Sequence, residues 1–188
     1  IAANKALLAA DVALVCDTGL WNPTTPAIVS SLRGCVGEDV TITGPRIDLH
    51  SGYYGGPAVN PIKVLSRILA SVHDKNGRIT IPGFYDGVKV PTPARRKAWK
   101  KLAFDAKAYL GGVGLSRPAG EKDFTALEQM WVRPTAEING MWGGYTGAGN
   151  KTVLPAQASA KMTFRLVAGQ DPKKIVRAFR SFVRKQLP

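Results

Sequence analysis

The sequence lacks the short motifs that identify most hydrolases and nucleotide-binding enzymes. Its 188 residues contain no HExxH zinc motif, no GxSxG nucleophile motif and no P-loop. Only two histidines are present, His50 and His73, and their spacing does not suit a shared metal ion. We therefore expect no complete hydrolytic site within this chain, so that any catalysis requires residues from outside it.

Cysteines and long apolar runs are also scarce. Cys16 and Cys35 form no CxxC motif and have no histidine nearby, which favours two small buried side chains in a reducing, cytoplasmic environment. The longest apolar run, residues 6–15, is interrupted by Asp11 and falls short of the roughly 18 residues of a membrane span. The chain begins at Ile1 without a signal-peptide pattern. These features predict a globular excerpt of a longer protein, with no membrane partner.

Acidic residues are outnumbered by basic ones. The chain has 26 Lys and Arg against 13 Asp and Glu, which gives a formal net charge of +13. Such an excess suggests nucleic-acid binding, because cations that neutralise phosphates release counterions. The cations, however, are spread over the faces of expected helices around residues 95–101 and 173–185. Since no zinc-finger, helix-turn-helix or RNA-binding aromatic pattern accompanies them, we expect solvated basic faces and keep nucleic-acid binding as the less favoured alternative.

The spacing of apolar residues predicts an α+β fold. Alternating or short apolar patterns indicate strands, at residues 13–16, in the extended region 27–43, and at 47–50, 136–139 and 156–167. Apolar residues three and four apart predict two amphipathic helices, one from Asn60–Pro61 to about Asp74 and one from Asp171–Pro172 onward. Two such helices would cover one face of a small antiparallel sheet.

Residues 78–135 are interpreted as an insertion between the first helix and the later strands. The insertion is expected to contain one short strand and two helices, at residues 79–81, 93–110 and 121–131. After the insertion, five glycines between Gly140 and Gly149 predict a loop. Glycines lose much conformational entropy on folding, so that such a loop suggests a function.

Two residues near apolar strands are candidates for chemistry. Asp17, in VCDTGLW, ends an expected strand, where its carboxylate would face a site; the alternative is a turn-forming aspartate. His50, in DLHSGYYGG, has an imidazole that can donate a hydrogen bond to a developing oxyanion; the alternative is a structural histidine at a strand end.

Two further candidates lie later in the chain. Arg165 shares the outward face of an alternating strand with Lys161 and Thr163, where it can hold a carboxylate or simply be a surface residue. Thr152 lies in the glycine-rich segment 143–155, whose backbone N–H groups suit an anion or a carbonyl; the alternative is a flexible hairpin.

Several stretches in a fixed order resemble the zinc metallopeptidase family of carnosinases, other dipeptidases, aminoacylases and succinyl-diaminopimelate desuccinylase. They are VCDTGLW, SLRG, DLHSGYYGG, NPIKVLSRILASVHDKNGRITIPGFYD, GAGNKTVLP and MTFRLVAGQDP. The stretch DLHSGYYGG, followed by NP and a long insertion, is most similar to the carnosinase-type dipeptidases. The resemblance covers nearly the whole chain.

The resemblance implies a fold and a domain organisation. Residues 1–30 would hold the last catalytic-domain strand and a hinge. Residues 31–188 would form a ferredoxin-like lid, or dimerisation, domain with a helical insertion at about 78–135. The chain would then be a fragment of a zinc-dependent dipeptidase that hydrolyses peptide bonds, inactive in isolation. The alternative within the same family is an amidohydrolase or deacylase of N-acyl amino acids.

The resemblance also implies a role for each candidate residue. Asp17 matches a terminal zinc ligand, and His50 matches a lid histidine that polarises the scissile carbonyl in the partner subunit's active site. Thr152 and Arg165 match substrate-binding positions, Arg165 for the substrate's terminal carboxylate. Asn139 matches a polar lid position beside the site.

Cofactors and partners follow from the same resemblance. The full enzyme would hold two zinc ions, or manganese or cobalt in their place, whereas this fragment would hold none, because the other ligands of the family are missing from it. Its partners would be its own catalytic domain, a second copy in a homodimer and a small peptide substrate, in the cytoplasm, with neither nucleic acid nor membrane.

Overall fold

The structure is a computed structural model that describes residues 2–14 and 19–188. It divides into two compact units, Ile1–Leu32 and Arg33–Pro188. The first unit contains the 3-10 helix η1 (Ala2–Asn4). The strand predicted at 13–16 is not formed in its described part, where Leu14 is 87% exposed, since so short a strand needs a pairing neighbour. Cys16 and Asp17 lie outside the described residues.

The second unit is built on a three-stranded antiparallel sheet. Its strands are β1 (Gly34–Thr43), β3 (Thr135–Gly143) and β5 (Gln157–Leu166), in the order β1-β5-β3. Alternate side chains of the central strand β5 are buried on one face: Ala158, Ala160, Met162, Phe164 and Leu166. The odd-numbered residues of β5 therefore point to the opposite face.

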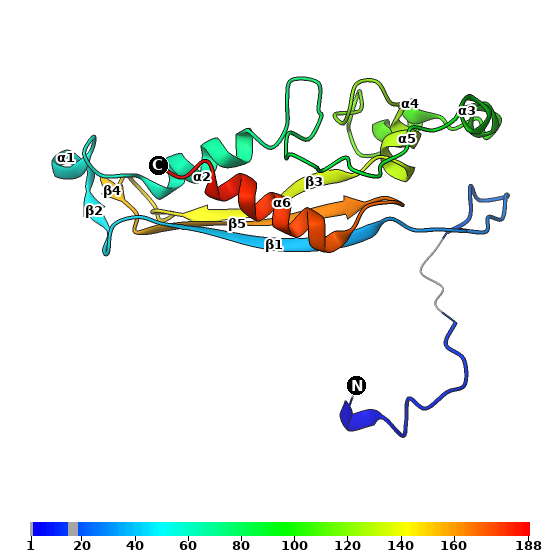
Figure 1. Cartoon of the computed structure of the whole chain (residues 1–188), viewed down its shortest axis with the longest axis horizontal. Coiled ribbons are helices and arrows are strands. Elements are labelled where there is room, and N and C mark those ends of the chain that lie inside the picture. Colours follow the sequence, from blue (N-terminus) through cyan, green and yellow to red (C-terminus); the bar gives the residue numbers. More distant parts are fainter. Residues whose placement is uncertain (1, 15–18) are drawn as a thin grey trace. The chain divides into compact units, whose positions relative to one another are not determined.

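Two helices cover the buried face of this sheet (Figure 1). Helix α2 (Pro61–Ala70) starts where the Asn60 side chain accepts a hydrogen bond from the Ile62 N–H, and helix α6 (Pro172–Arg184) starts at Asp171 in the same way. Both have proline at the first helical position. Their apolar faces complete the core, with Leu65 and Ile68 from α2 and Ile175 and Phe179 from α6 fully or almost fully buried. The predicted α+β fold, with two helices on one face of a small antiparallel sheet, is confirmed.

A second, two-stranded sheet lies at one end of the unit (Figure 1). It pairs β2 (Leu49–His50) with β4 (Val153–Leu154), and the single-turn helix α1 (Ser51–Tyr54) follows β2. The glycine-rich loop predicted from Gly140 starts later than expected, because β3 continues to Gly143 through pairing with β5. Of the extended region 27–43, only β1 is a strand.

The segment between α2 and β3 differs most from the prediction. The single helix expected at 93–110 is two helices, α3 (Pro93–Lys100) and α4 (Ala106–Gly111). The break contains Ala103 at φ 49° and Asp105, whose side chain caps α4 by accepting from the Ala108 N–H. The strand expected at 79–81 is reduced to a bridge between His73 and Ile79, and α5 covers only Ala126–Trp131.

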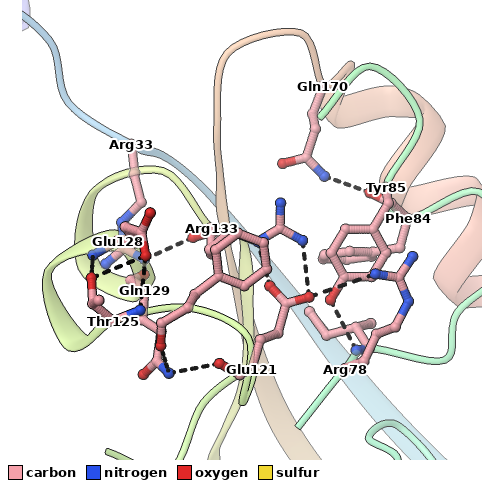
Figure 2. A network of polar contacts seen from close by, with 12 residues as sticks. Arg33, Arg78, Phe84, Tyr85, Glu121, Thr125, Glu128, Gln129, Arg133 and Gln170 are labelled. Carbon is pink, nitrogen blue, oxygen red and sulfur yellow. Dashed lines mark hydrogen bonds and ion pairs between the residues drawn. The ribbon is translucent and has the colours of Figure 1, made fainter. Parts of the chain in front are cut away.

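A buried ion pair holds this segment together (Figure 2). Glu121 and Arg133 are 8% and 4% exposed, and both carboxylate oxygens accept from the guanidinium, the Arg133 Nη2–Glu121 Oε1 distance being 2.9 Å. The Arg133 guanidinium also lies 4.1 Å from the ring centroid of Phe124 and 5.1 Å from that of Tyr85. Buried charges of this kind need both partners.

The exposure of Cys35 differs from the prediction made for it. Cys35 is a free, exposed thiol, so the expectation that it is buried is wrong. It pairs with Arg165 across β1 and β5 and therefore lies on the sheet face that the helices leave open. In the part of the chain that the structure describes, no helix is long and apolar enough to span a membrane.

Candidate functional site

His50 and Thr152 lie together at the two-stranded end of the unit. His50 is the N-cap of α1, and its Nδ1 accepts a hydrogen bond from the Gly52 N–H at 2.8 Å. Its Nε2 lies 3.2 Å from the Thr152 hydroxyl oxygen. The Thr152 carbonyl also accepts from the Ser51 N–H at 2.9 Å. The structure thus brings together two of the residues proposed for one site.

The hydrogen bond at Nδ1 fixes the tautomer of His50. Because a ring nitrogen that accepts carries no proton, the neutral imidazole has its proton on Nε2. That N–H is directed to the Thr152 hydroxyl oxygen, and the exposed ring also leaves it open to an oxygen of a bound molecule. An N–H donor held in a fixed orientation is what stabilisation of a developing oxyanion requires.

The glycines after His50 permit this arrangement. A Cβ on Gly52 would lie 2.7 Å from the His50 Cε1 atom, and a Cβ on Gly55 would lie 2.3 Å from the Ser51 carbonyl oxygen. The Tyr53 ring lies against the imidazole, with 5.2 Å between centroids. The sequence motif did not identify Gly52 as the residue that orients the imidazole.

Asp48 is a further supporting residue that sequence reasoning missed. Its Oδ1 accepts from the Ala156 N–H at 2.8 Å, between residues 108 positions apart in the chain. This hydrogen bond ties the start of β2 to the connection between β4 and β5. The only signal in the sequence is the place of Asp48 two residues before His50.

Arg165 lies in a different environment on the open face of the sheet. It is exposed in β5, between Cys35 of β1 and Thr135 of β3. Arg33 donates from Nη1 to the Gln129 and Arg133 carbonyls, at 3.2 Å each. Its guanidinium is close enough to Arg165 for the two positive charges to repel each other. Burial, and then the like charge of Arg165, hold the pKa of Arg33 below its ordinary value. Arg33 belongs to the SLRG stretch, but its place beside Arg165 was not predicted.

Within one chain, Arg165 is far from the His50–Thr152 pair. The eight steps along β5 from Gln157 to Arg165 span about 27 Å, and Arg165 is next to last in β5. Figure 1 shows β2, β4 and α1 beyond the other end of β5, where this strand begins. A dipeptide spans only about 7 Å when extended. The two groups therefore cannot hold one dipeptide within a single chain.

Asn139 lies between these two ends on the edge strand β3. The ladder with β5 shifts register between Ile138 and Gly140, which places Asn139 at a β-bulge, with its side chain exposed. Three apolar side chains of the same strand are exposed by 45–51%: Ile138, Met141 and Trp142. The edge of β3 is thus more apolar than a solvent-facing strand edge usually is.

The described residues do not form a metal centre. Across residues 2–14 and 19–188, no group of three or more His, Cys, Asp and Glu side chains is arranged to hold a metal ion. Asp17, the predicted ligand, lies outside these residues. These described residues therefore do not supply the donor set of a dinuclear site.

Comparison with known proteins points to one family. Residues 30–188 match the profile of a family described as peptidase dimerisation domain. The chain is 30% identical over 183 residues to the Cys-Gly metallodipeptidase dug1 of Schizosaccharomyces pombe, which covers 97% of this chain and 38% of the relative. It is also 30% identical over 155 residues to the Beta-Ala-His dipeptidase of Homo sapiens, covering 82% of this chain and 31% of the relative.

Solved structures agree with the sequence relatives. The dipeptidase Dug1p of Saccharomyces cerevisiae superposes with a TM-score of 0.73 at 30% identity, covering 82% of this chain and 32% of that chain. Human carnosine dipeptidase 1 gives a TM-score of 0.73 at 26% identity, covering 82% and 33%. This chain spans about one third of the length of the proteins that it matches.

Proposed function

This chain belongs to the family of peptidase dimerisation domains, and from that premise we propose that it is the lid and dimerisation domain of a metal-dependent dipeptidase. In this proposal it contributes substrate-binding and oxyanion-stabilising residues to active sites that two subunits share, and it is inactive in isolation. The observation that supports this most is the His50–Thr152 pair, in which the His50 Nε2 is a fixed donor. This pair lies farther from Arg165 of the same chain than a dipeptide can span.

The dimer forms through the edge of β3 in this proposal. Its exposed apolar side chains, Ile138, Met141 and Trp142, gain burial when a second copy covers them. A two-fold axis at that edge, perpendicular to the strand, makes the two β3 strands antiparallel. Since Thr135 pairs with Arg165 and Gly143 pairs with Ala158 near the other end of β5, the His50 end of one subunit then approaches the Arg165 end of its partner.

This arrangement gives each residue a role. His50 donates from Nε2 to the oxygen of the scissile carbonyl in the partner's site, and Thr152 holds the imidazole in place and binds substrate. Arg165 binds the terminal carboxylate of the peptide through its guanidinium fork. Asn139, midway along β3, contributes a polar contact from the edge of the sheet. Removal of an oxyanion donor costs about 100- to 1000-fold in rate.

The relatives are named metallodipeptidases, which implies a metal cofactor. We propose that two zinc ions are held by the remainder of the enzyme, with manganese or cobalt as the other candidates, and that Asp17 is one ligand. The exposed thiol of Cys35 is suited to a reducing compartment, which supports a cytoplasmic location. The comparisons do not favour the deacylase or nucleic-acid alternatives.

The test is dipeptide hydrolysis by the full-length enzyme that contains this chain. His50→Ala is expected to lower kcat by about 100-fold or more, with metal content and dimerisation unchanged. His73→Ala is the matched control, because the only other histidine lies near the core helix α2 and bridges to Ile79. If both variants are as active as the wild type, His50 does not have the proposed role.

A further inference from the structure

The outward face of α6 carries an unusual concentration of positive charge. Helix α6 and its C-cap contain six Lys and Arg residues and no Asp or Glu, from Lys173 to Lys185. Five exposed residues on this face line an open groove of about 520 Å³, namely Arg177, Arg180, Ser181, Arg184 and Lys185. These five residues are called the α6 groove below. The helix packs its opposite face on the sheet, through Ile175 and Phe179.

Among the ion pairs that the described residues form, only one involves a cation of this helix. Arg180 pairs with Glu38, through hydrogen bonds of 2.8 and 3.1 Å, and this carboxylate raises the pKa of Arg180. Among the ion pairs of the described residues, no other involves a cation of the α6 groove. Arg177, Arg184 and Lys185 therefore present net positive charge to an incoming anion.

Helix stability does not explain the pattern. Cations in the last turn interact favourably with the helix dipole, which accounts for Arg184 and Lys185. Arg177 and Arg180 lie in the middle of the helix, and the spacings 177–180 and 180–184 place like charges side by side. Such pairs destabilise a helix by about 0.2–0.5 kcal/mol each. A bound anion would turn this repulsion into attraction.

The size and lining of the groove indicate the class of anion. Its volume lies within the range typical of small-molecule sites, about 300–1,000 Å³. The seven steps from Arg177 to Arg184 span about 10.5 Å along the helix axis, so that several positive charges fall within reach of one compact ligand. Guanidinium groups pair bidentately with phosphate, and the Ser181 hydroxyl adds a further donor. The five lining residues include no aromatic ring on which a base could stack.

We propose that the α6 groove binds a compact anion with two or more linked phosphate groups. The phosphate chain is the recognised element, whether it comes from inorganic tripolyphosphate or from a nucleoside triphosphate. This site goes beyond the proposed peptidase function and does not depend on it, because α6 lies on the sheet face opposite to Arg165.

The test is calorimetric titration of tripolyphosphate into the 188-residue chain. We expect saturable binding of one ligand per chain, and a loss of affinity of about tenfold or more in the double variant Arg177→Gln and Arg184→Gln, since each removes a charge-assisted hydrogen bond. The matched control is Lys97→Gln with Lys100→Gln, which makes the same change in net charge on exposed positions of α3. It is expected to bind within about twofold of wild type.

Each further result supports or overturns the proposal. ATP that binds with the affinity of tripolyphosphate, and orthophosphate that binds much more weakly, support recognition of a phosphate chain. The charge-preserving variant Arg177→Lys with Arg184→Lys is expected to lose part of the affinity, because it loses the guanidinium forks. Equal losses in the α6 and α3 variants, binding of ATP alone, or no saturable binding would overturn the proposal.

Discussion

Glu121→Gln is predicted to destabilise the second unit strongly. The change keeps the shape of the side chain but removes the negative charge that faces Arg133 (Figure 2). Both residues are more than nine-tenths buried, so that solvent does not screen the remaining guanidinium. Arg78 approaches the same carboxylate at 3.7 Å, but its side chain is 56% exposed and adds little.

The magnitude follows from the cost of an unpaired buried charge. Removal of one partner of a buried ion pair costs about 3–5 kcal/mol. The value here should be near the lower end, about 3 kcal/mol, because the rings of Phe124 and Tyr85 still face the Arg133 guanidinium and stabilise its charge. A domain with a typical stability of about 5–15 kcal/mol would lose a large part of it.

Urea denaturation followed by circular dichroism measures this loss as a shift of the unfolding midpoint. At an m-value of about 2 kcal/mol per molar, a loss of about 3 kcal/mol moves the midpoint by about 1.5 M. Asp39→Asn is the control, because Asp39 and Lys161 form an exposed ion pair with side chains 67% and 58% accessible. We expect it to cost less than about 1 kcal/mol. If Glu121→Gln costs no more than Asp39→Asn, the reasoning about the buried pair is refuted.

Three further predictions concern Tyr85, Thr125 and Gly52. Burial raises the pKa of Tyr85 to about 12 from 10.0, so its contribution to stability is full below pH 10 and is lost as the pH rises towards 12; Tyr85→Phe should flatten this part of the stability–pH curve, and an unchanged slope would count against it. Thr125→Ala removes the capping box of α5 and should lower the free energy of unfolding by about 1 kcal/mol in chemical denaturation, whereas a neutral effect would mean that the cap contributes little. Gly52→Ala places a methyl group 2.7 Å from the His50 ring and should reduce dipeptide hydrolysis by the full-length enzyme while its melting temperature stays within a few degrees; full activity would show that the ring need not be held in this way.

The core elements were predictable because each carries a local signal. Strand β5 is signalled by the alternation of buried side chains from Ala158 to Leu166. Helices α2 and α6 are signalled by a capping residue followed by proline, at Asn60–Pro61 and Asp171–Pro172. Each signal spans only a few residues, and each element forms where it was predicted. The break between α3 and α4 was missed because Asp105 was not taken as a helix cap. The exposure of Cys35 was missed because it depends on which face of the sheet the helices cover, which is a property of the whole fold.

The candidate site was predictable in its parts but not in its arrangement. The motifs identified His50 and Thr152, and the structure places them in contact. The tautomer of His50 depends on the Gly52 N–H, and the separation of Arg165 depends on the length and direction of β5. Asp48 supports the start of β2 by a hydrogen bond to Ala156, and the positive charge of Arg33 lies beside that of Arg165. In both cases the two residues are more than 100 positions apart in the chain. Such contacts cannot be predicted from the spacing of residues in the sequence.

The central claim, that His50 of one subunit and Arg165 of the other serve one active site, is tested most directly by subunit mixing. Inactive full-length enzymes that carry His50→Ala and Arg165→Ala are mixed in equal amounts, dissociated and allowed to reassociate, and dipeptide hydrolysis is measured. Random exchange gives mixed dimers with one intact and one doubly altered site, so that about one quarter of the wild-type activity should return. No return of activity, with mixed dimers present, would show that both residues serve the same subunit's site and would contradict the account.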